Sequence, residues 1–252
     1  MKKFNKILIF SLLGLILFSS LWFNSYFIKD NISSFKERLF QAGKESDVVI
    51  IFNPGGWGTI SLEKALDFNP IISEIKSKIE EQNYTVSIVE YQRTKETLIG
   101  KIGSIKEIIF NFPESSESFA ETIDDFLNNN PDDKIIVAGL SNGAAFASSA
   151  MEELSQEENS VFSIELGAPF WENKIEGNNI LKIINNNDIL ANGNIGELLF
   201  SLIKTPFVWA YGNIKGEGTS LTKAMNISGH DYYWDEVGKE ITSFIENNFS
   251  RK

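Results

Sequence analysis

Short apolar runs alternate along the chain with longer amphipathic stretches. Five of the runs are rich in hydrophobic and β-branched residues and most end at turn-forming residues, a pattern typical of buried β-strands. They span Asp47–Gly56, Tyr84–Tyr91, Lys134–Leu140, Ser160–Pro169 and Asn179–Asp188. The first ends in Asn-Pro-Gly-Gly, which forces a turn after the strand.

Helical patterns occupy the stretches between the first four strands and one stretch after the last strand. Pro70 breaks or offsets the first helical stretch, and Pro131 stops the second, whose serines provide the expected cap. The helices are predicted over Leu62–Gln82, Ser115–Pro131, Asn142–Glu158 and Trp234–Asn248. Strands that are apolar on both faces and alternate with helices predict an α/β fold, with a mostly parallel sheet and helices on both faces.

The carboxyl ends of parallel strands are where such folds place their functional residues. In this chain the positions directly after strands include 53–58, Ser141, 167–169 and Asp188. Functional residues are therefore expected at these four places.

The N-terminus forms a separate unit. Lys2, Lys3 and Lys6 precede an uncharged, largely apolar stretch over 7–28, and about 20 apolar residues suffice to span a bilayer. A signal anchor or a signal peptide is predicted for residues 1–28, and the bulky side chains of FSSLWFNS favour an uncleaved anchor. The positive-inside rule then places the domain outside the cytoplasm, membrane-anchored, or secreted if the segment is cleaved.

Residues 29–46 follow as a predicted polar tether with a helical pattern near SSFKERLF, and the folded domain is expected over 47–252. The chain of 252 residues, 42% of them hydrophobic, is long enough for one ordinary domain. The formal net charge of −11 argues against a nucleic-acid partner, which requires basic residues to replace phosphate counterions.

Cysteine and histidine counts restrict the chemistry further. The chain has no cysteine, which excludes disulfides, thiolate catalysis and zinc–thiolate sites. It has a single histidine, His230, so a metal site with several histidines is impossible. We expect no metal ion and no organic cofactor.

Ser141 lies in Gly-Leu-Ser-Asn-Gly, between a predicted strand and a predicted helix. Glycines two residues before and after a serine relieve the crowding of a sharp strand-to-helix turn that presents a nucleophile. The helix N-terminus would also stabilise negative charge developing nearby. The alternative is an ordinary N-cap serine.

A serine hydroxyl requires a base, and His230 is the only imidazole, on a loop before the last helix. Asp188 follows the last predicted strand and would orient that imidazole, although it could be a plain turn residue. Asp231 adjoins the histidine, Asp235 lies in the following helix and Glu165 lies inside a strand, so each is a poorer choice. The order serine, aspartate, histidine is that expected for this kind of fold.

The loop Asn-Pro-Gly-Gly-Trp-Gly follows the first strand. Its glycines let backbone N–H groups turn inward, so the region of Gly56 and Trp57, with the N–H of Asn142, is the predicted oxyanion hole. A functionless turn or a phosphate loop are the alternatives, but the Gly-Lys-Ser/Thr ending and G-x-G-x-x-G are both absent.

These motifs together resemble the α/β-hydrolase superfamily over about 47–252. GLSNGAAFA is similar to its nucleophile elbow and NPGGWG to its oxyanion loop, while ELGAPFWENK, IINNNDIL and GHDYYW resemble the second half of class 3 lipases. The resemblance implies Ser141 as nucleophile, Asp188 as acid and His230 as base. Two positions depart from the lipases: Leu140 stands where they usually have histidine, and the oxyanion loop is nearer to that of other esterases.

The sequence thus predicts a serine hydrolase for carboxylic esters, with a lean toward lipid or other apolar acyl esters. A thioesterase or amidase with the same triad, and a non-catalytic membrane-tethered binding module, remain open alternatives. Two apolar stretches, Leu98–Phe112 and Ile195–Gly212, could cap the substrate or simply pack on the sheet. The pattern does not predict an oligomeric state.

Overall fold

The computed structural model describes residues 30–95, 97, 100, 107–108, 110–155, 160–172, 175–194, 204, 207–216 and 229–250. The predicted membrane or signal segment at 1–28 lies outside these residues. Within the described ranges, no helix combines the length and the apolar character that a membrane span requires.

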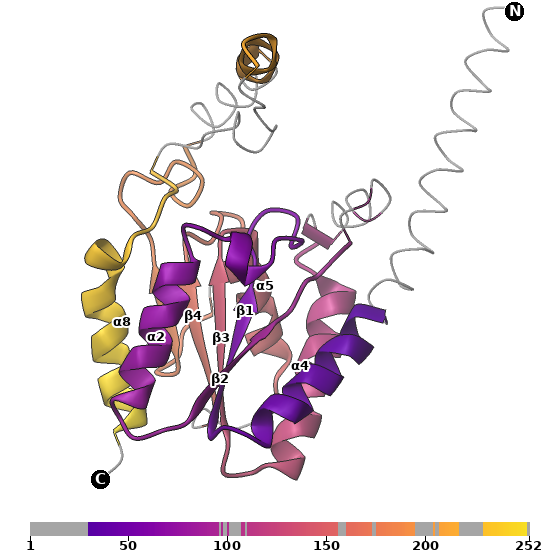
Figure 1. Cartoon of the computed structure of the whole chain (residues 1–252), viewed down its shortest axis with the longest axis vertical. Coiled ribbons are helices and arrows are strands. Elements are labelled where there is room, and N and C mark those ends of the chain that lie inside the picture. Colours follow the sequence, from indigo (N-terminus) through magenta and orange to yellow (C-terminus); the bar gives the residue numbers. More distant parts are fainter. Residues whose placement is uncertain are drawn as a thin grey trace, which may run out of the picture.

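Five parallel strands form one sheet in the order β2-β1-β3-β4-β5 (Figure 1). The strands are β1 (Val48–Asn53), β2 (Val86–Glu90), β3 (Lys134–Leu140), β4 (Val161–Leu166) and β5 (Ile180–Ile183). All five lie inside the apolar runs that predicted them. The α/β class and the parallel sheet are therefore confirmed.

Helices cover both faces of the sheet (Figure 1). In β1, Ile50 and its alternate neighbours pack with α2 (Asn69–Glu80) and α8 (Trp234–Phe249), whereas Ile51 packs with α4 (Pro113–Asn129) and α5 (Asn142–Glu153). Side chains of a strand alternate between faces, so an apolar residue at every position fits a sheet buried on both sides. The two cores that result fix the positions of the strand ends.

Two predicted helices begin elsewhere than expected. Pro70 stands in the first turn of α2, and a short 3-10 turn, Leu62–Lys64, precedes that helix. The predicted serine cap of α4 is wrong, because the helix begins at Pro113 and Ser115 instead donates its hydroxyl hydrogen to Glu107, at 2.6 Å. Proline is favoured at the first helical position, where its missing N–H costs nothing.

The predicted tether is also corrected by the structure. Residues 30–43 form a helix, and Phe35 and Leu39 on it are fully buried in the same core as α4 and α5. The rings of Phe35 and Tyr91 are 5.0 Å apart, centroid to centroid. The polar face of this helix made the segment look like a linker, but its two apolar side chains belong to the packed domain.

Candidate active site

Ser141 occupies the turn between β3 and α5 with a strained backbone. Its φ of 57° and ψ of −125° lie in a region that non-glycine residues rarely adopt. Its backbone N–H donates to the carbonyl of Leu166 at the end of β4, at 2.9 Å. The carbonyl of Ser141 accepts the N–H groups of Ala144 and Ala145 in α5, but its side chain makes no capping hydrogen bond, so the helix does not use the half-buried hydroxyl.

The glycines on either side of Ser141 are required by close backbone contacts. A Cβ at Gly139 would lie well under 3.0 Å from the carbonyl of Gly143, and a Cβ at Gly143 would lie equally close to the carbonyl of Asn53. Contacts this short do not occur between real atoms, so the turn excludes any side chain at both positions. The predicted reason for the two glycines agrees with this geometry.

Asp188 and His230 form a hydrogen-bonded pair. Asp188 lies in the turn after β5 and is completely buried, and its Oδ2 is 2.8 Å from Nδ1 of His230. Its Oδ1 accepts the backbone N–H groups of Leu190 and Ala191, at 2.9 and 3.1 Å. Burial raises the pKa of Asp188, but the hydrogen bond to His230 and the other donors outweigh burial and hold that pKa below its ordinary value. The carboxylate is thus charged and fixed in orientation.

Tyr232 is a third member of this group, and the sequence did not reveal its role. Its hydroxyl donates to Oδ2 of Asp188 at 2.8 Å and accepts the N–H of Asn185 at 3.2 Å. Its ring is buried against Gly167, where a Cβ would overlap it. Burial raises the pKa of Tyr232, so the phenol stays protonated and acts as a donor. The aromatic residues after the histidine were the only available signal.

The loop that carries His230 packs directly on the turn that contains Asp188. Gly229 has a φ of 73°, and a Cβ there would overlap the carbonyl of Asn187. The side chain of His230 is only 15% exposed. Its Nε2 is buried and makes no hydrogen bond within the described part of the chain. One ring nitrogen is therefore held by the carboxylate, and the other is unoccupied.

The end of β4 lies between Ser141 and the Asp188–His230 pair. Leu166 binds the backbone of Ser141, and the next residue, Gly167, packs on Tyr232. Two strand spacings, roughly 10 Å, separate the ends of β3 and β5. The described residues include no hydrogen bond between the hydroxyl of Ser141 and Nε2 of His230. The structure therefore pairs the predicted acid, Asp188, with the predicted base, His230. It places Ser141 at the same carboxyl ends of the strands, but without a hydrogen bond to the base.

The predicted oxyanion loop passes over Ser141. A Cβ at Gly55 would be 3.4 Å from Cβ of Ser141. The carbonyl of Gly56, which has a φ of 55°, accepts a hydrogen bond from Nδ2 of Asn142 at 3.2 Å. The backbone N–H of Asn142 lies in the first turn of α5, where no intrahelical acceptor exists. Gly56 thus contacts the residue that follows the serine, and the assignment of Gly56, Trp57 and Asn142 to an oxyanion hole stays a prediction.

The chain is similar to known proteins in its three-dimensional structure, as a comparison with solved structures shows. A cutinase of Trichoderma reesei, solved in complex with a C11Y4 phosphonate inhibitor, aligns with a TM-score of 0.48 and 13% identity, over 94% of this chain and 99% of the cutinase. An acetylxylan esterase aligns with a TM-score of 0.43 and 11% identity, over 80% of this chain and 98% of its own. No protein-family model matches the chain, and no curated protein does.

Glu165, the competing carboxylate, is occupied elsewhere. It is buried within β4, accepts the hydroxyl hydrogen of Ser163 at 2.7 Å and lies 3.2 Å from Nζ of Lys182. Lys182 also pairs with Glu172 at 2.6 Å and donates to Ser148 of α5 at 2.9 Å. This buried network, and not His230, satisfies Glu165.

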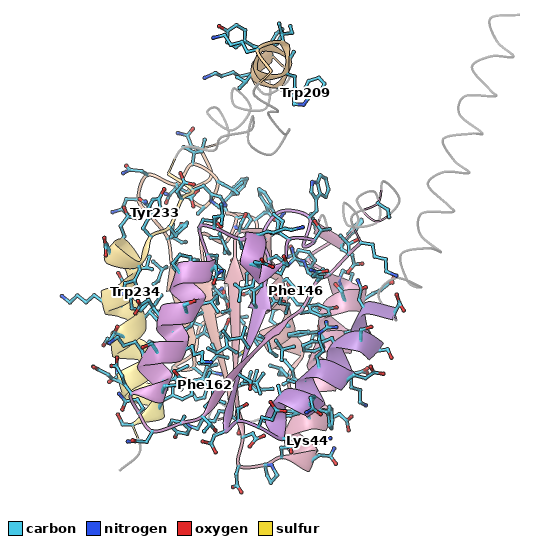
Figure 2. The ribbon with its side chains drawn as sticks, viewed as in Figure 1. Lys44, Phe146, Phe162, Trp209, Tyr233 and Trp234 are labelled. Carbon is cyan, nitrogen blue, oxygen red and sulfur yellow. The ribbon has the colours of Figure 1, made fainter. Side chains whose placement is uncertain are left out.

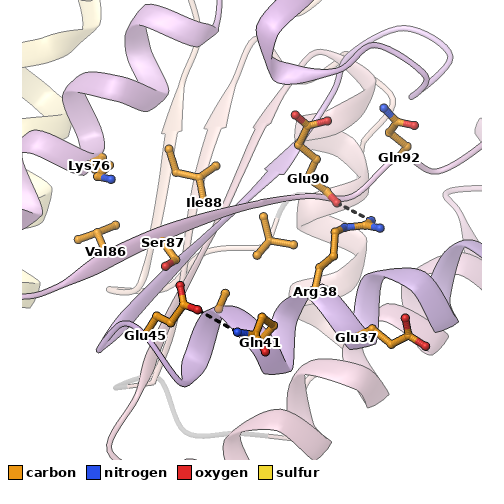
Figure 3. Close-up of a pocket in the computed structure, with 12 residues that line it drawn as sticks. Glu37, Arg38, Gln41, Glu45, Lys76, Val86, Ser87, Ile88, Glu90 and Gln92 are labelled. Carbon is orange, nitrogen blue, oxygen red and sulfur yellow. Dashed lines mark hydrogen bonds between the residues drawn. The ribbon is translucent and has the colours of Figure 1, made fainter.

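Other parts of the described surface lack the features of a reactive centre. No group of three or more acidic or histidine side chains there could hold a metal ion. A groove of about 860 Å³ runs along the edge strand β2, where Arg38 donates to the carbonyl of Glu90 at 3.1 Å (Figure 3). None of the predicted catalytic or oxyanion residues lines this groove. A smaller, asparagine-lined hollow of about 560 Å³ lies beside Asp188.

Proposed function

We propose that the protein is a serine hydrolase that cleaves carboxylic esters, with Ser141 as nucleophile, His230 as base and Asp188 as the acid that orients it. The observation that carries this proposal is the pairing of the single imidazole with a buried carboxylate, at the sheet edge where a serine is held in strained geometry. Strain of this kind persists where a function requires it. The resemblance of the motifs to the α/β-hydrolase superfamily supports the same assignment.

The reaction follows from the orientation of the imidazole. Because Nδ1 donates to Asp188, Nε2 is the unprotonated nitrogen and can accept the hydroxyl proton of Ser141 as its oxygen attacks the ester carbonyl carbon. The C–O bond to the alcohol then breaks, and the imidazolium returns the proton to the leaving alkoxide. A water molecule, deprotonated by the same nitrogen, attacks the acyl-enzyme and releases the carboxylic acid and Ser141.

Negative charge on the carbonyl oxygen requires nearby donors. The backbone N–H groups of Asn142 and of the Gly56–Trp57 region are the candidates, because they lie beside Ser141 and, for Asn142, at a helix N-terminus. Each such donor is worth about 10²-fold or more in rate in related chemistry.

Aromatic side chains around the site favour an apolar acyl group. Trp57, Phe170 and Trp171 are each 39% exposed and Tyr233 is 57% exposed, on loops at the carboxyl ends of the strands. Figure 2 places Tyr233 at the start of α8. Exposed aromatic residues gathered at one site suit an apolar ligand. The two stretches predicted as possible caps give little further evidence about the substrate. The structure describes 98–112 only in part. In the second stretch, residues 207–212 are helical and expose Trp209 (Figure 2).

We place this enzyme outside the cytoplasm, held at a membrane by residues 1–28, on the basis of their lysines and apolar run. An anchored esterase would meet apolar esters at the lipid surface. Fusion of residues 1–46 to a reporter that is active only outside the cytoplasm tests the location.

A panel of p-nitrophenyl esters from acetate to palmitate, a matched thioester and a matched anilide tests the proposed function. The protein should begin at residue 30, because Phe35 and Leu39 belong to the core. We expect ester hydrolysis that Ser141→Ala and His230→Gln reduce at least about 10³-fold without loss of fold. Ser155→Ala is the matched control, because that serine binds Asp124 far from the strand ends.

Each outcome of the panel decides between the alternatives. Preference for the thioester or the anilide would replace the ester assignment while keeping the triad. Absence of Ser141-dependent turnover of any substrate by the folded protein would favour a non-catalytic binding module.

A further inference from the structure

The loop over Ser141 contains one peptide group whose orientation is unusually well fixed. The N–H of Gly58 donates to the carbonyl of Gly55 at 3.0 Å, so residues 55–58 form a β-turn. The peptide that joins Gly56 to Trp57 is the middle unit of this turn and is not used by the turn's own hydrogen bond. Its direction is therefore set by other contacts.

Two side chains hold the carbonyl of this middle peptide. Nδ2 of Asn142 donates to the oxygen of Gly56 at 3.2 Å, and Nη2 of Arg93 donates to the same oxygen at 3.4 Å. The peptide is trans and planar, so its N–H, which belongs to Trp57, points opposite to that oxygen. Holding the carbonyl on one side thereby aims the Trp57 N–H to the other.

Arg93 is itself rigidly placed. Its guanidinium lies 5.3 Å from the ring centroid of Phe112 and 5.4 Å from that of Phe146, and the side chain is only 7% exposed. A Cβ on Gly58 would touch Arg93 at 2.9 Å, so the loop rests directly on this side chain. A buried charge is costly unless it is compensated, and among the described residues no carboxylate forms an ion pair with it. Burial lowers the pKa of Arg93 to about 10, which still leaves it protonated at neutral pH.

We propose that Arg93 is a positioning residue for the oxyanion hole: with Asn142 it fixes the Gly56 carbonyl and so presents the N–H of Trp57 to the developing oxyanion. The charge also polarises the peptide, which makes its N–H a stronger donor. This inference rests on the proposed ester hydrolysis. It explains why a cation is buried beneath a glycine loop that has no phosphate-binding motif.

The test is the effect of Arg93→Met on the steady-state hydrolysis of p-nitrophenyl butyrate. Methionine keeps the apolar stem between the two phenylalanine rings but removes the donor and the charge. We expect kcat to fall about 10-fold to 100-fold with KM changed less than about 3-fold, because an oxyanion donor acts mainly in the transition state. Arg93→Lys, which retains the charge, should recover part of the loss.

Two further variants make the readout specific. Lys134→Met is the matched control, since Lys134 also lies over an aromatic ring and donates to a backbone carbonyl, that of Asn248, but at the amino end of β3. It should leave kcat unchanged. Asn142→Ala removes the second donor to the Gly56 carbonyl, and its effect should combine non-additively with that of Arg93→Met because both act on one group.

The outcomes separate this inference from the proposed function. An inactive wild type would overturn both. An active wild type with an unchanged kcat in Arg93→Met would overturn the role of Arg93 alone, as would a change confined to KM. If Arg93→Met does not fold, Asn142→Ala and Arg93→Lys decide: unchanged kcat in both contradicts the inference, and a loss in kcat at constant KM supports it.

Discussion

Close backbone packing fixes the serine half of the candidate site, whereas hydrogen bonds fix the acid–base half. The turn at Ser141 is held by close backbone contacts of Gly139 with Gly143 and of Gly143 with Asn53. Neither glycine has room for a Cβ. Asp188 is held by four donors, two on each carboxylate oxygen. The backbone packing around Ser141 tolerates no added side-chain atom. The hydrogen bonds to Asp188, in contrast, can be removed one at a time by substitution.

This difference predicts two kinds of mutational response. A substitution that breaks the close packing should destabilise the fold, because the backbone must shift and the residues attached to it move as well. A substitution that removes a hydrogen bond should change the protonation or the orientation of the side chains in the acid–base half and leave the fold intact. Substitutions in the two halves should therefore be distinguishable by comparing kcat with the free energy of unfolding.

Asp188→Asn should have the largest effect on activity. The amide N–H₂ would face Nδ1 of His230 and the Tyr232 hydroxyl, which favours the wrong imidazole tautomer. We expect kcat to fall about 10³-fold to 10⁴-fold, with a circular dichroism spectrum like that of the wild type. Asp124→Asn, on the surface of α4, is the control. A loss below about 10-fold would show that Asp188 does not orient the base.

Gly143→Ala tests the steric half. Alanine is preferred to glycine in helices by about 1 kcal/mol, so without the clash α5 would be stabilised. The clash with the carbonyl of Asn53 should instead destabilise the protein by about 3 kcal/mol and lower kcat about 100-fold. Gly177→Ala, whose Cβ would meet side-chain atoms of Asn179 and Ile180 and not a backbone carbonyl, is the matched control in a thermal unfolding experiment. Greater stability in Gly143→Ala would refute the packing account.

Tyr232→Phe should have a smaller effect, because Asp188 keeps three of its four donors. We expect kcat to fall about 10-fold, in line with the loss of one hydrogen bond to a charged group. The pKa of Asp188 should rise, since a donor to its charged form is gone. Stability from this depressed pKa is lost as the pH falls through it, so the variant should lose stability at a higher pH than the wild type. Coincident acid limbs in the two pH profiles would be inconsistent with this role.

Glu165→Gln should leave activity nearly unchanged and alter only the pH dependence of stability. Burial raises the pKa of Glu165 to about 8, although Lys182 opposes this. The folded protein then binds more protons than the unfolded chain between about pH 5 and 8, so wild-type stability falls as the pH rises, by up to about 1.4 kcal/mol per unit. Glutamine cannot ionise, so denaturant titrations of the variant should show a flatter profile. Identical profiles would mean that Glu165 is not neutral in the folded state.

Much of this architecture could be predicted from the sequence because most of the strands carry apolar residues on both faces. The sharp turn at Ser141 was also predictable, since Gly139 and Gly143 leave a visible pattern around it. The contacts of Tyr232 with Asp188 and of Arg93 with Gly56 were not, because each joins segments far apart in the chain. The helical pattern within 30–43 was predicted, but its packing into the domain was missed because charged residues dominate the local composition and only the packed fold reveals the burial of Phe35.

Covalent labelling with a fluorophosphonate, followed by mass spectrometry of the peptides, tests the central claim most directly. Phosphonylation requires an activated serine, so the wild-type protein starting at residue 30 should gain one adduct, on the peptide that contains Ser141. The adduct should vanish in Ser141→Ala and form far more slowly in His230→Gln. Folded wild-type protein that carries no adduct, or carries it on a different serine, would contradict the account.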